Sequence, residues 1–456
     1  MFASFSTLGS DLRQVLRLAW PVMLSMLSYS FMAAADAIFV GRLGTVPLAA
    51  IGLAVTTVFL FIGLPMGLLR GIRVATAQAI GAQRQQDADG YGWQAIWLSL
   101  LSGLAVASIS GLGPWVFSML GATAEVQVEA LAYFRLRVLA APVILLAMGL
   151  TAWFEGRGDT RTPMRVNVAA NILAIVLDYV MVVGFGPIPS LGIRGAAWAG
   201  IIASSFASVV LLLSAWPVLR RRSWRPVRAL LEEGTRLGIP IGVQRMLDIL
   251  AWTTLTGVLA SAGDAQLAAH VLAIRVLMLS FLPGLAIAEA TAVLVGQAVG
   301  AREPERAHRS WRAGVAAAVG VMAIGGLGFV LVPDLLIAPF HAAGDVIPIA
   351  KNLLLVAAAF QLIDAVATVT YLSLDGAGDT RFTLVASLVL SWGVKLPLGV
   401  LLVRWAGMGA VGAWLGLTAE LGVLLAVLGW RWYSRRWYRP EALPEVEAPA
   451  QVAAAV

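Results

Sequence analysis

The sequence predicts an all-α polytopic membrane protein whose twelve transmembrane helices form two six-helix bundles. Three observations lead to this prediction. Of the 456 residues, 60% are hydrophobic and only 12% are charged, whereas soluble proteins are about 25% charged. Apolar runs of about 20 residues, the length that crosses a bilayer, recur from one end of the chain to the other. The second half of the chain also repeats the first.

Composition excludes several other classes of protein. The chain has no cysteine, which rules out disulfides and thiol chemistry, and its three histidines, His270, His308 and His341, are too scattered for a metal cluster. We therefore expect no metal and no cofactor. The net charge of +7 comes from arginines in short loops and near the C-terminus, where membrane topology explains them, so no nucleic-acid partner is expected. The N-terminal stretch lacks the cleavage site of a signal peptide, so the first helix should be retained.

The twelve helices are expected where apolar runs are bounded by glycine, proline and charged loops. They cover residues 12–41, 47–74, 90–112, 125–152, 163–184, 193–219, 232–260, 267–294, 308–332, 346–372, 382–403 and 409–433. Loops after even-numbered helices are rich in arginine, and loops after odd-numbered helices are nearly free of it. Because cytoplasmic loops carry the basic excess, both termini are expected in the cytoplasm and the protein in the plasma (inner) membrane.

The internal repeat appears when the chain is aligned on itself at an offset of 219. This offset places Pro21 on Pro240 and Gly44 on Gly263, and one residue later EGRGDTR at Glu155 falls on a similar DGAGDTR. Six helices separate the copies. Because six is even, the copies share one orientation and should be related by an axis along the membrane normal. The paired prolines should bend their helices and are candidate hinges.

The repeat also defines the expected domains. Residues 1–219 form the first bundle, 220–231 a basic cytoplasmic linker, 232–433 the second bundle, and 434–456 a cytoplasmic tail. The tail is rich in Ala, Pro and Glu and has no apolar helical face, so disorder is expected.

Two acids mark the first bundle as a pathway for ions or substrate. A charge at membrane depth costs roughly 3 kcal/mol on insertion scales, so Asp36 is read first as functional, the alternative being a structural helix-paired acid. At 1.5 Å per residue, Asp36 and Asp178 each lie about 9 Å below the outer boundary. If they meet, the two carboxyl groups suit a proton and equally a cation. In the alternative they face different sides of the bundle.

The second bundle is arranged differently, because Leu255 stands at the position that repeats Asp36. Asp248 and Asp364 fall roughly 16 to 18 Å from a boundary, near the midplane, and a functional role is favoured for both. Lys395 and Glu420 are comparably deep. Lys395 would neutralise one acid, so a transport role and a structural ion pair both remain open for Lys395 and Glu420.

These residues stand in segments that resemble the multidrug and toxic compound extrusion (MATE) family, over roughly residues 16–432. The similar segments include ADAIFVGRLGTVPLAAIG at Ala35, GDTRTPM at Gly158, LDYVMVVGFG at Leu177, LGIPIGVQRMLDI at Leu237 and QLIDAVATVTYLSLDGAGDTR at Gln361. The resemblance is to the bacterial norfloxacin-exporter branch. It implies antiport of organic, mostly cationic, drugs or metabolites against a cation.

The resemblance assigns roles residue by residue. Asp36 and Asp178 match the acids tied to proton or sodium coupling, while Asp248 and Asp364 match acids of the second half. The family often has an Asn one turn before Asp178, where this chain has Ala174, and a Thr within 196–200, where this chain has none. Asn171 is the candidate substitute. Sodium prefers several oxygen ligands and a proton needs none, so proton coupling is favoured over sodium.

The predicted function is therefore a cation-coupled antiporter working by alternating access, with membrane lipid, H⁺ or Na⁺ and small organic cations as its partners. It is not expected to be an enzyme, and the resemblance suggests a monomer. Three alternatives stay open: a flippase for a polyprenyl-lipid-linked precursor, a membrane-embedded enzyme, and a scaffold that transports nothing. The buried acids argue against the first and the last. No nucleophile with its base supports the second.

Overall fold

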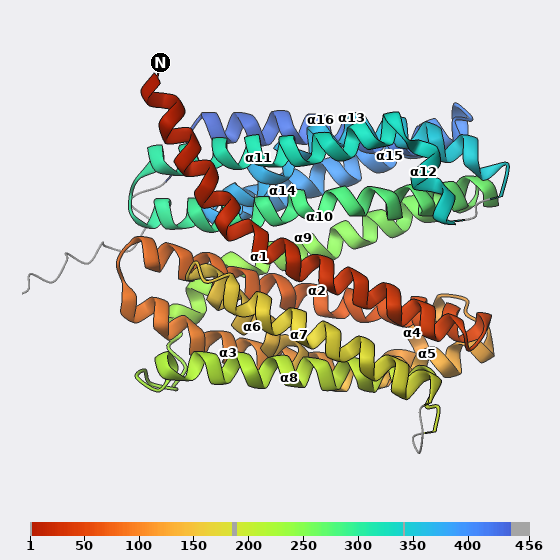
Figure 1. Ribbon diagram of the computed structural model, residues 1–456, viewed down its shortest axis with the longest axis horizontal. Helices are drawn as coiled ribbons and strands as arrows, with labels where there is room; N and C mark the ends of the chain where they lie inside the picture. Colours follow the sequence, from red (N-terminus) through yellow and green to blue (C-terminus); the bar gives the residue numbers. More distant parts are fainter. Residues whose placement is uncertain (1, 185–188, 341–342, 439–456) are drawn as a thin grey trace, which may run out of the picture. The chain divides into compact units, whose positions relative to one another are not determined.

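The computed structural model describes residues 2–184, 189–340 and 343–438. His341 and the tail beyond residue 438 lie outside the described residues. All regular elements in the described ranges are helices (Figure 1). In the first half they are α1 (Phe2–Gly41), α2 (Thr45–Gly81), α3 (Gln85–Ser108), η1 (Ile109–Leu112), α4 (Gly113–Met119), α5 (Ala124–Leu139), α6 (Ala141–Gly156), α7 (Arg161–Asp178), η2 (Tyr179–Val183) and α8 (Ile193–Leu219).

In the second half the helices are α9 (Arg228–Ala260), α10 (Asp264–Gly300), α11 (Pro304–Leu331), α12 (Pro333–Ile337), η3 (Ala338–Phe340), α13 (Val346–Gly376), α14 (Thr380–Leu390), η4 (Ser391–Lys395), α15 (Leu396–Val400), η5 (Leu401–Trp405) and α16 (Gly409–Tyr433). Three short elements, η2, η4 and η5, are π-helical turns. The all-α membrane fold predicted from the sequence is therefore observed.

The number of helices that can span a membrane is ten in the described chain, or eleven if the bent pair α5 and α6 counts as one span. The expected helix over 125–152 is this pair, which bends by 53°. Pro142 stands in the first turn of α6, and a proline without an N–H interrupts the helical hydrogen-bond pattern there. The predicted count of twelve is not reached, because α9 is not among the apolar spans. Its 33 residues include Gln244, Arg245 and Asp248.

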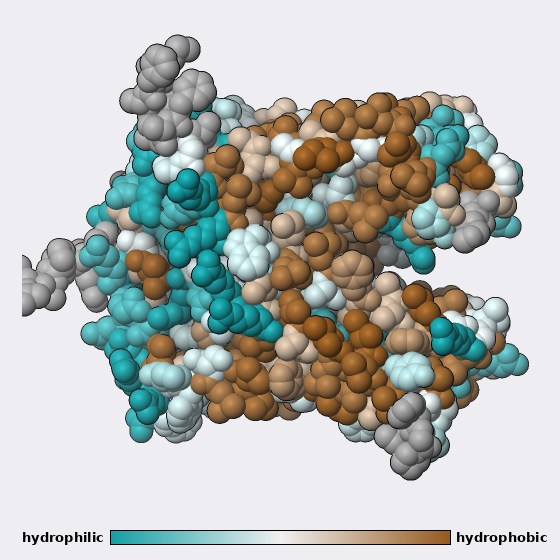
Figure 2. All heavy atoms as spheres, viewed as in Figure 1, coloured by the Kyte–Doolittle hydropathy of each residue, from teal (hydrophilic) through white to brown (hydrophobic). Residues whose placement is uncertain are grey.

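The chain divides into two compact units, each with its own core. The N unit contains Leu24–Ile80 and Arg84–Val243, and the C unit contains residues 2–23, 81–83 and 244–438 as far as they are described. In the N unit α3 packs on α6, and α8 packs on α5, α6 and α7. In the C unit α10, α11 and α13 pack on one another, and α16 packs on α10 and α13. Figure 2 shows apolar side chains over the middle of the helices and hydrophilic ones near their ends, as expected for helices that face lipid.

Two helices pass from one unit to the other close to a proline. The first part of α1 belongs to the C unit, and from Leu24, shortly after Pro21, the helix belongs to the N unit. The first part of α9 belongs to the N unit, and from Gln244, shortly after Pro240, it belongs to the C unit. A proline inside a helix removes one hydrogen bond and allows a bend. The two candidate hinges therefore stand beside the points at which these helices change units.

Backbone details recur at the offset of the sequence repeat. Gly44 and its mate Gly263 both have positive φ, 124° and 115°, a conformation that favours glycine. A Cβ on Gly156 would lie 2.6 Å from the carbonyl oxygen of Arg73, and a Cβ on its mate Gly376 would lie 2.3 Å from that of Ala292. Only glycine permits this close approach of helices in each unit.

Candidate ion and substrate sites

The N unit brings the two predicted acids of the first bundle together. Asp36 lies near the end of α1, and Asp178 is the last residue of α7, directly before the π-helical turn η2. Asp178 is only 3% exposed. The two carboxylates interact electrostatically. Their charges therefore act on each other within this unit, and π-helical turns like the one after Asp178 occur frequently at functional sites.

A basic residue that the sequence analysis missed completes this site. Arg137 of α5 interacts electrostatically with both Asp36 and Asp178, although in the described chain it forms no direct ion pair with either. Its side chain reaches across to α8, where a Cβ built on Gly200 would lie 2.5 Å from Nη1. Two carboxylates and one guanidinium leave one net negative charge. The available signal was a pair of arginines, Arg135 and Arg137, at the start of the apolar run at 131–150.

Two tyrosine hydroxyls and one asparagine amide belong to the surroundings of these charges. Tyr29 and Tyr133 both interact electrostatically with Asp36 and Arg137. Asp36 Oδ1 is buried and has no hydrogen-bond partner among the described residues. Asn171 donates from Nδ2 to Ser28 Oγ at 2.8 Å, so part of its amide is already engaged with α1.

The C unit holds a second set of charges with a different arrangement. Asp248 of α9 and Glu420 of α16 both interact electrostatically with Lys395, the last residue of η4. Lys395 and Glu420 are each 4% exposed. The Lys395 ammonium also lies 6.0 Å from the centre of the Trp252 ring, which attracts a cation to its face. The structure thus brings three of the four predicted residues of the second bundle into one set.

Two serines connect these charges by hydrogen bonds. Lys395 Nζ donates to Ser391 Oγ at 3.0 Å, and Ser391 Oγ donates to Glu420 Oε1 at 3.3 Å. Ser387 Oγ donates to Asp248 Oδ1 at 3.2 Å. Ser391 and Lys395 are the first and last residues of the turn η4, which precedes Pro397. The missing N–H of this proline accounts for the widened turn, and the turn determines where both side chains point.

Asp364 joins the same set from α13. It is 6% exposed and interacts electrostatically with Glu420. Thr368 donates to its Oδ1 at 2.9 Å, while Oδ2 is buried without a partner among the described residues. Three carboxylates and one ammonium leave two net negative charges here. A site of this charge has the right sign for protons or for an organic cation.

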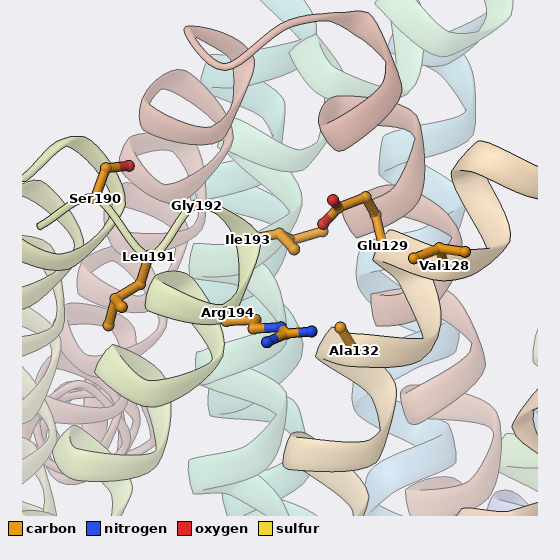
Figure 3. Close-up of a pocket in the computed structure, with 8 residues that line it drawn as sticks. All are labelled: Val128, Glu129, Ala132, Ser190, Leu191, Gly192, Ile193 and Arg194. Carbon is orange, nitrogen blue, oxygen red and sulfur yellow. The ribbon is translucent and has the colours of Figure 1, made fainter.

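Two surface pockets contain none of the predicted residues. One, of about 360 Å³, lies between α5 and the start of α8, where Arg194 and the α5 side chains face each other (Figure 3). The other lies on α10. Within residues 2–184, 189–340 and 343–438, no group of three His, Asp or Glu side chains is arranged to hold a metal ion. The lining residues of the first pocket are Val128, Glu129, Ala132, Ser190, Leu191, Gly192, Ile193 and Arg194.

The comparison with known families is decisive for the class of protein. The sequence profile of the MatE family matches residues 21–180 and again 240–401. The chain belongs to the MatE family. Within it, a probable multidrug resistance protein NorM of Brucella suis is 28% identical over 439 residues, covering 93% of each chain. A probable NorM of Mesorhizobium japonicum is 30% identical and covers 93% of this chain and 94% of its own.

Solved structures of MATE proteins have the same fold. A structure described as MATE in the bent conformation has a TM-score of 0.85 at 24% identity and covers 94% of this chain and 96% of its own. A MOP superfamily transporter from Pyrococcus furiosus, described as having a binding pocket of reverse polarity, also reaches 0.85, at 23% identity, with coverage of 93% and 96%. This MatE member is therefore a transmembrane transporter of the multidrug efflux family. Membership of a transporter family argues against an enzyme.

Proposed function

We propose that this transporter exchanges protons for organic cations by alternating access and so exports drugs or metabolites from the cytoplasm. The observation that carries the proposal is a separate set of partly or fully buried ionisable residues in each unit, with formal charges of −1 and −2 when every group is ionised. Ionisable residues inside a membrane mark ion and substrate pathways. Two distinct sets suit two distinct cations, as an antiporter requires.

The N unit is the proposed proton site. Asp36 and Asp178 take up a proton on the outer side, the drug leaves, and the loaded transporter turns inward and releases the proton. Ala174, which is 1% exposed, offers no oxygen where a sodium ion would need one, and Asn171 is engaged with Ser28. These features favour a proton over sodium.

The C unit is the proposed site for the organic cation or a second coupling ion. The negative charge comes from Asp248, Asp364 and Glu420. In the absence of a bound cation, the positive charge of Lys395 compensates one of these negative charges. Such a site selects by charge and tolerates different shapes, because the attraction to several carboxylates does not depend on one geometry.

Several finer features of the architecture belong to the same proposal. We count α9 and the bent pair α5 and α6 as spans, which gives twelve, with residues 1–219 and 232–433 as parallel repeats. The double match of the family profile and the recurring backbone details support the repeat. Bending at Pro21 and Pro240 would accompany the change between states. Both termini lie in the cytoplasm of an inner-membrane monomer.

The experiment is efflux of a fluorescent organic cation from proteoliposomes under a proton gradient or a sodium gradient. Wild type, Asp36→Asn and the matched control Glu125→Gln are compared; Glu125 is an exposed acid of the same unit. We expect efflux with the proton gradient alone, lost in Asp36→Asn and kept in Glu125→Gln. A well-folded Asp36→Asn protein with full gradient-driven efflux would refute the scheme, and sodium-driven efflux would refute the choice of ion.

The same preparation separates the alternatives. A flippase for an anionic lipid-linked precursor would move that lipid and leave the dye gradient unchanged. A membrane-embedded enzyme would turn over a substrate without any ion gradient.

A further inference from the structure

We propose that Arg137 is a tethered cation that excludes sodium from the N unit site and thereby makes the site selective for protons. This inference rests on the proposed function, because it concerns the ion that loads Asp36 and Asp178. It adds a residue that determines ion specificity and that lies on a helix, α5, with no predicted site residue.

The guanidinium lies within electrostatic range of both acids. Arg137 interacts electrostatically with Asp36, Asp178, Tyr29 and Tyr133, which come from α1, α7 and α5. Since no direct ion pair closes on either carboxylate in the described chain, the carboxylate oxygens are not consumed by the arginine. Asp36 Oδ1 is buried with no hydrogen-bond partner among the described residues. The acids thus stay available to a proton although a cation is already beside them.

The position of the side chain depends on Gly200. A Cβ at this residue of α8 would lie 2.5 Å from Arg137 Nη1, so the absence of a side chain creates the space that the guanidinium occupies. A hydroxyl-bearing residue at Gly200 would do two things at once. It would displace the guanidinium and add an oxygen near the acids.

Arginine is a poor neighbour for a metal ion for two reasons. Its guanidinium has five N–H donors and no acceptor, whereas transporters coordinate sodium with oxygens such as backbone carbonyls. It also repels any further positive charge. The repulsion acts on every cation, but a proton forms an O–H bond with a carboxylate and needs no shell of oxygens. A proton therefore loads where sodium does not.

The size of the effect follows from Coulomb's law. For an assumed separation of roughly 6 Å and an effective dielectric constant of about 20, removing one unit of positive charge strengthens the binding of a monovalent cation about 100-fold. Arg137→Gln removes the charge and replaces it with a polar side chain of similar size. Arg137→Lys keeps the charge, and Arg135→Gln removes an exposed arginine two residues away on the same helix.

The test is titration calorimetry of the purified full-length protein with NaCl, with choline chloride at equal ionic strength as the reference. We expect only weak sodium binding, near the detection limit of the titration, for the wild type, Arg137→Lys and Arg135→Gln. Sodium affinity should rise about 100-fold in Arg137→Gln, and adding Asp36→Asn should abolish the gain, which locates the ion in the N unit. A folded Arg137→Gln protein that binds sodium no better than wild type would overturn the inference.

A second variant keeps the inference testable if Arg137→Gln does not fold. Gly200→Ser retains the arginine but displaces it, so sodium affinity should rise in the same direction; an unchanged affinity would again overturn the inference. Proton-driven efflux by the wild type is measured in parallel. If that efflux is absent, the proposed function fails, whereas unchanged sodium affinity with normal proton-driven efflux refutes only the role of Arg137.

Discussion

Replacing Lys395 by Met should destabilise the C unit, and removing one acid as well should restore most of the loss. For an assumed separation of roughly 5 Å and an effective dielectric constant of about 20, each interaction of the ammonium with Asp248 or Glu420 is worth about 3 kcal/mol. Removing one partner of a direct buried ion pair costs about 3 to 5 kcal/mol, which is an upper limit here because in the described chain Lys395 Nζ contacts Ser391 Oγ and no carboxylate directly. We therefore expect Lys395→Met to lower the free energy of unfolding by about 3 kcal/mol, since one acid can take up a proton and relieve part of the repulsion.

The assay is thermal unfolding of the detergent-solubilised protein for Lys395→Met, Glu420→Gln and the double variant. The chain has only one other lysine, Lys351, whose ion pair with Asp334 at 2.6 Å is solvent-exposed. Lys351→Met should therefore cost at most about 1 kcal/mol. If the double variant is no more stable than Lys395→Met alone, the charges of Lys395 and Glu420 do not compensate each other and the description of this set is wrong.

Two further predictions follow from the same contacts. Asp178→Asn should abolish proton-driven dye efflux as Asp36→Asn does, because the two acids form one site; efflux at the wild-type rate in proteoliposomes would contradict this. Gly376→Ala should lower the free energy of unfolding by about 1 to 3 kcal/mol through overpacking, since its Cβ would lie 2.3 Å from the Ala292 oxygen. The control Gly52→Ala has open space around the new methyl group and should be neutral or stabilising. Equal shifts of the melting temperature for both variants would argue against the close approach of the helices at Gly376.

The fold was largely predictable because apolar runs mark membrane helices directly. The expected helices at 193–219 and 409–433 coincide with α8 and α16. The expected helix at 47–74 was too short, because α2 continues to Gly81 beyond the apolar stretch, and hydropathy detects lipid rather than the end of a helix. The bend between α5 and α6 was missed although Pro142 was visible in the sequence.

The sites were less predictable, because depth along a helix does not fix the direction of a side chain. Equal depth suggested that Asp36 and Asp178 meet, and the structure brings them together. An apolar helix has little periodicity to set its rotation, so nothing indicated that Arg137 turns towards them. The position of Lys395 depends on a π-helical turn, which the proline after it suggests but does not determine.

The central claim is exchange of protons for organic cations, and a counterflow measurement tests it most directly. Proteoliposomes are given a gradient of ethidium and no proton gradient, the membrane potential is clamped with potassium and valinomycin, and internal pH is followed with a trapped dye. Our account predicts that protons move opposite to the organic cation, and that this movement is lost in both Asp36→Asn and Asp178→Asn. Ethidium transport by the wild type without any opposing proton movement would contradict it.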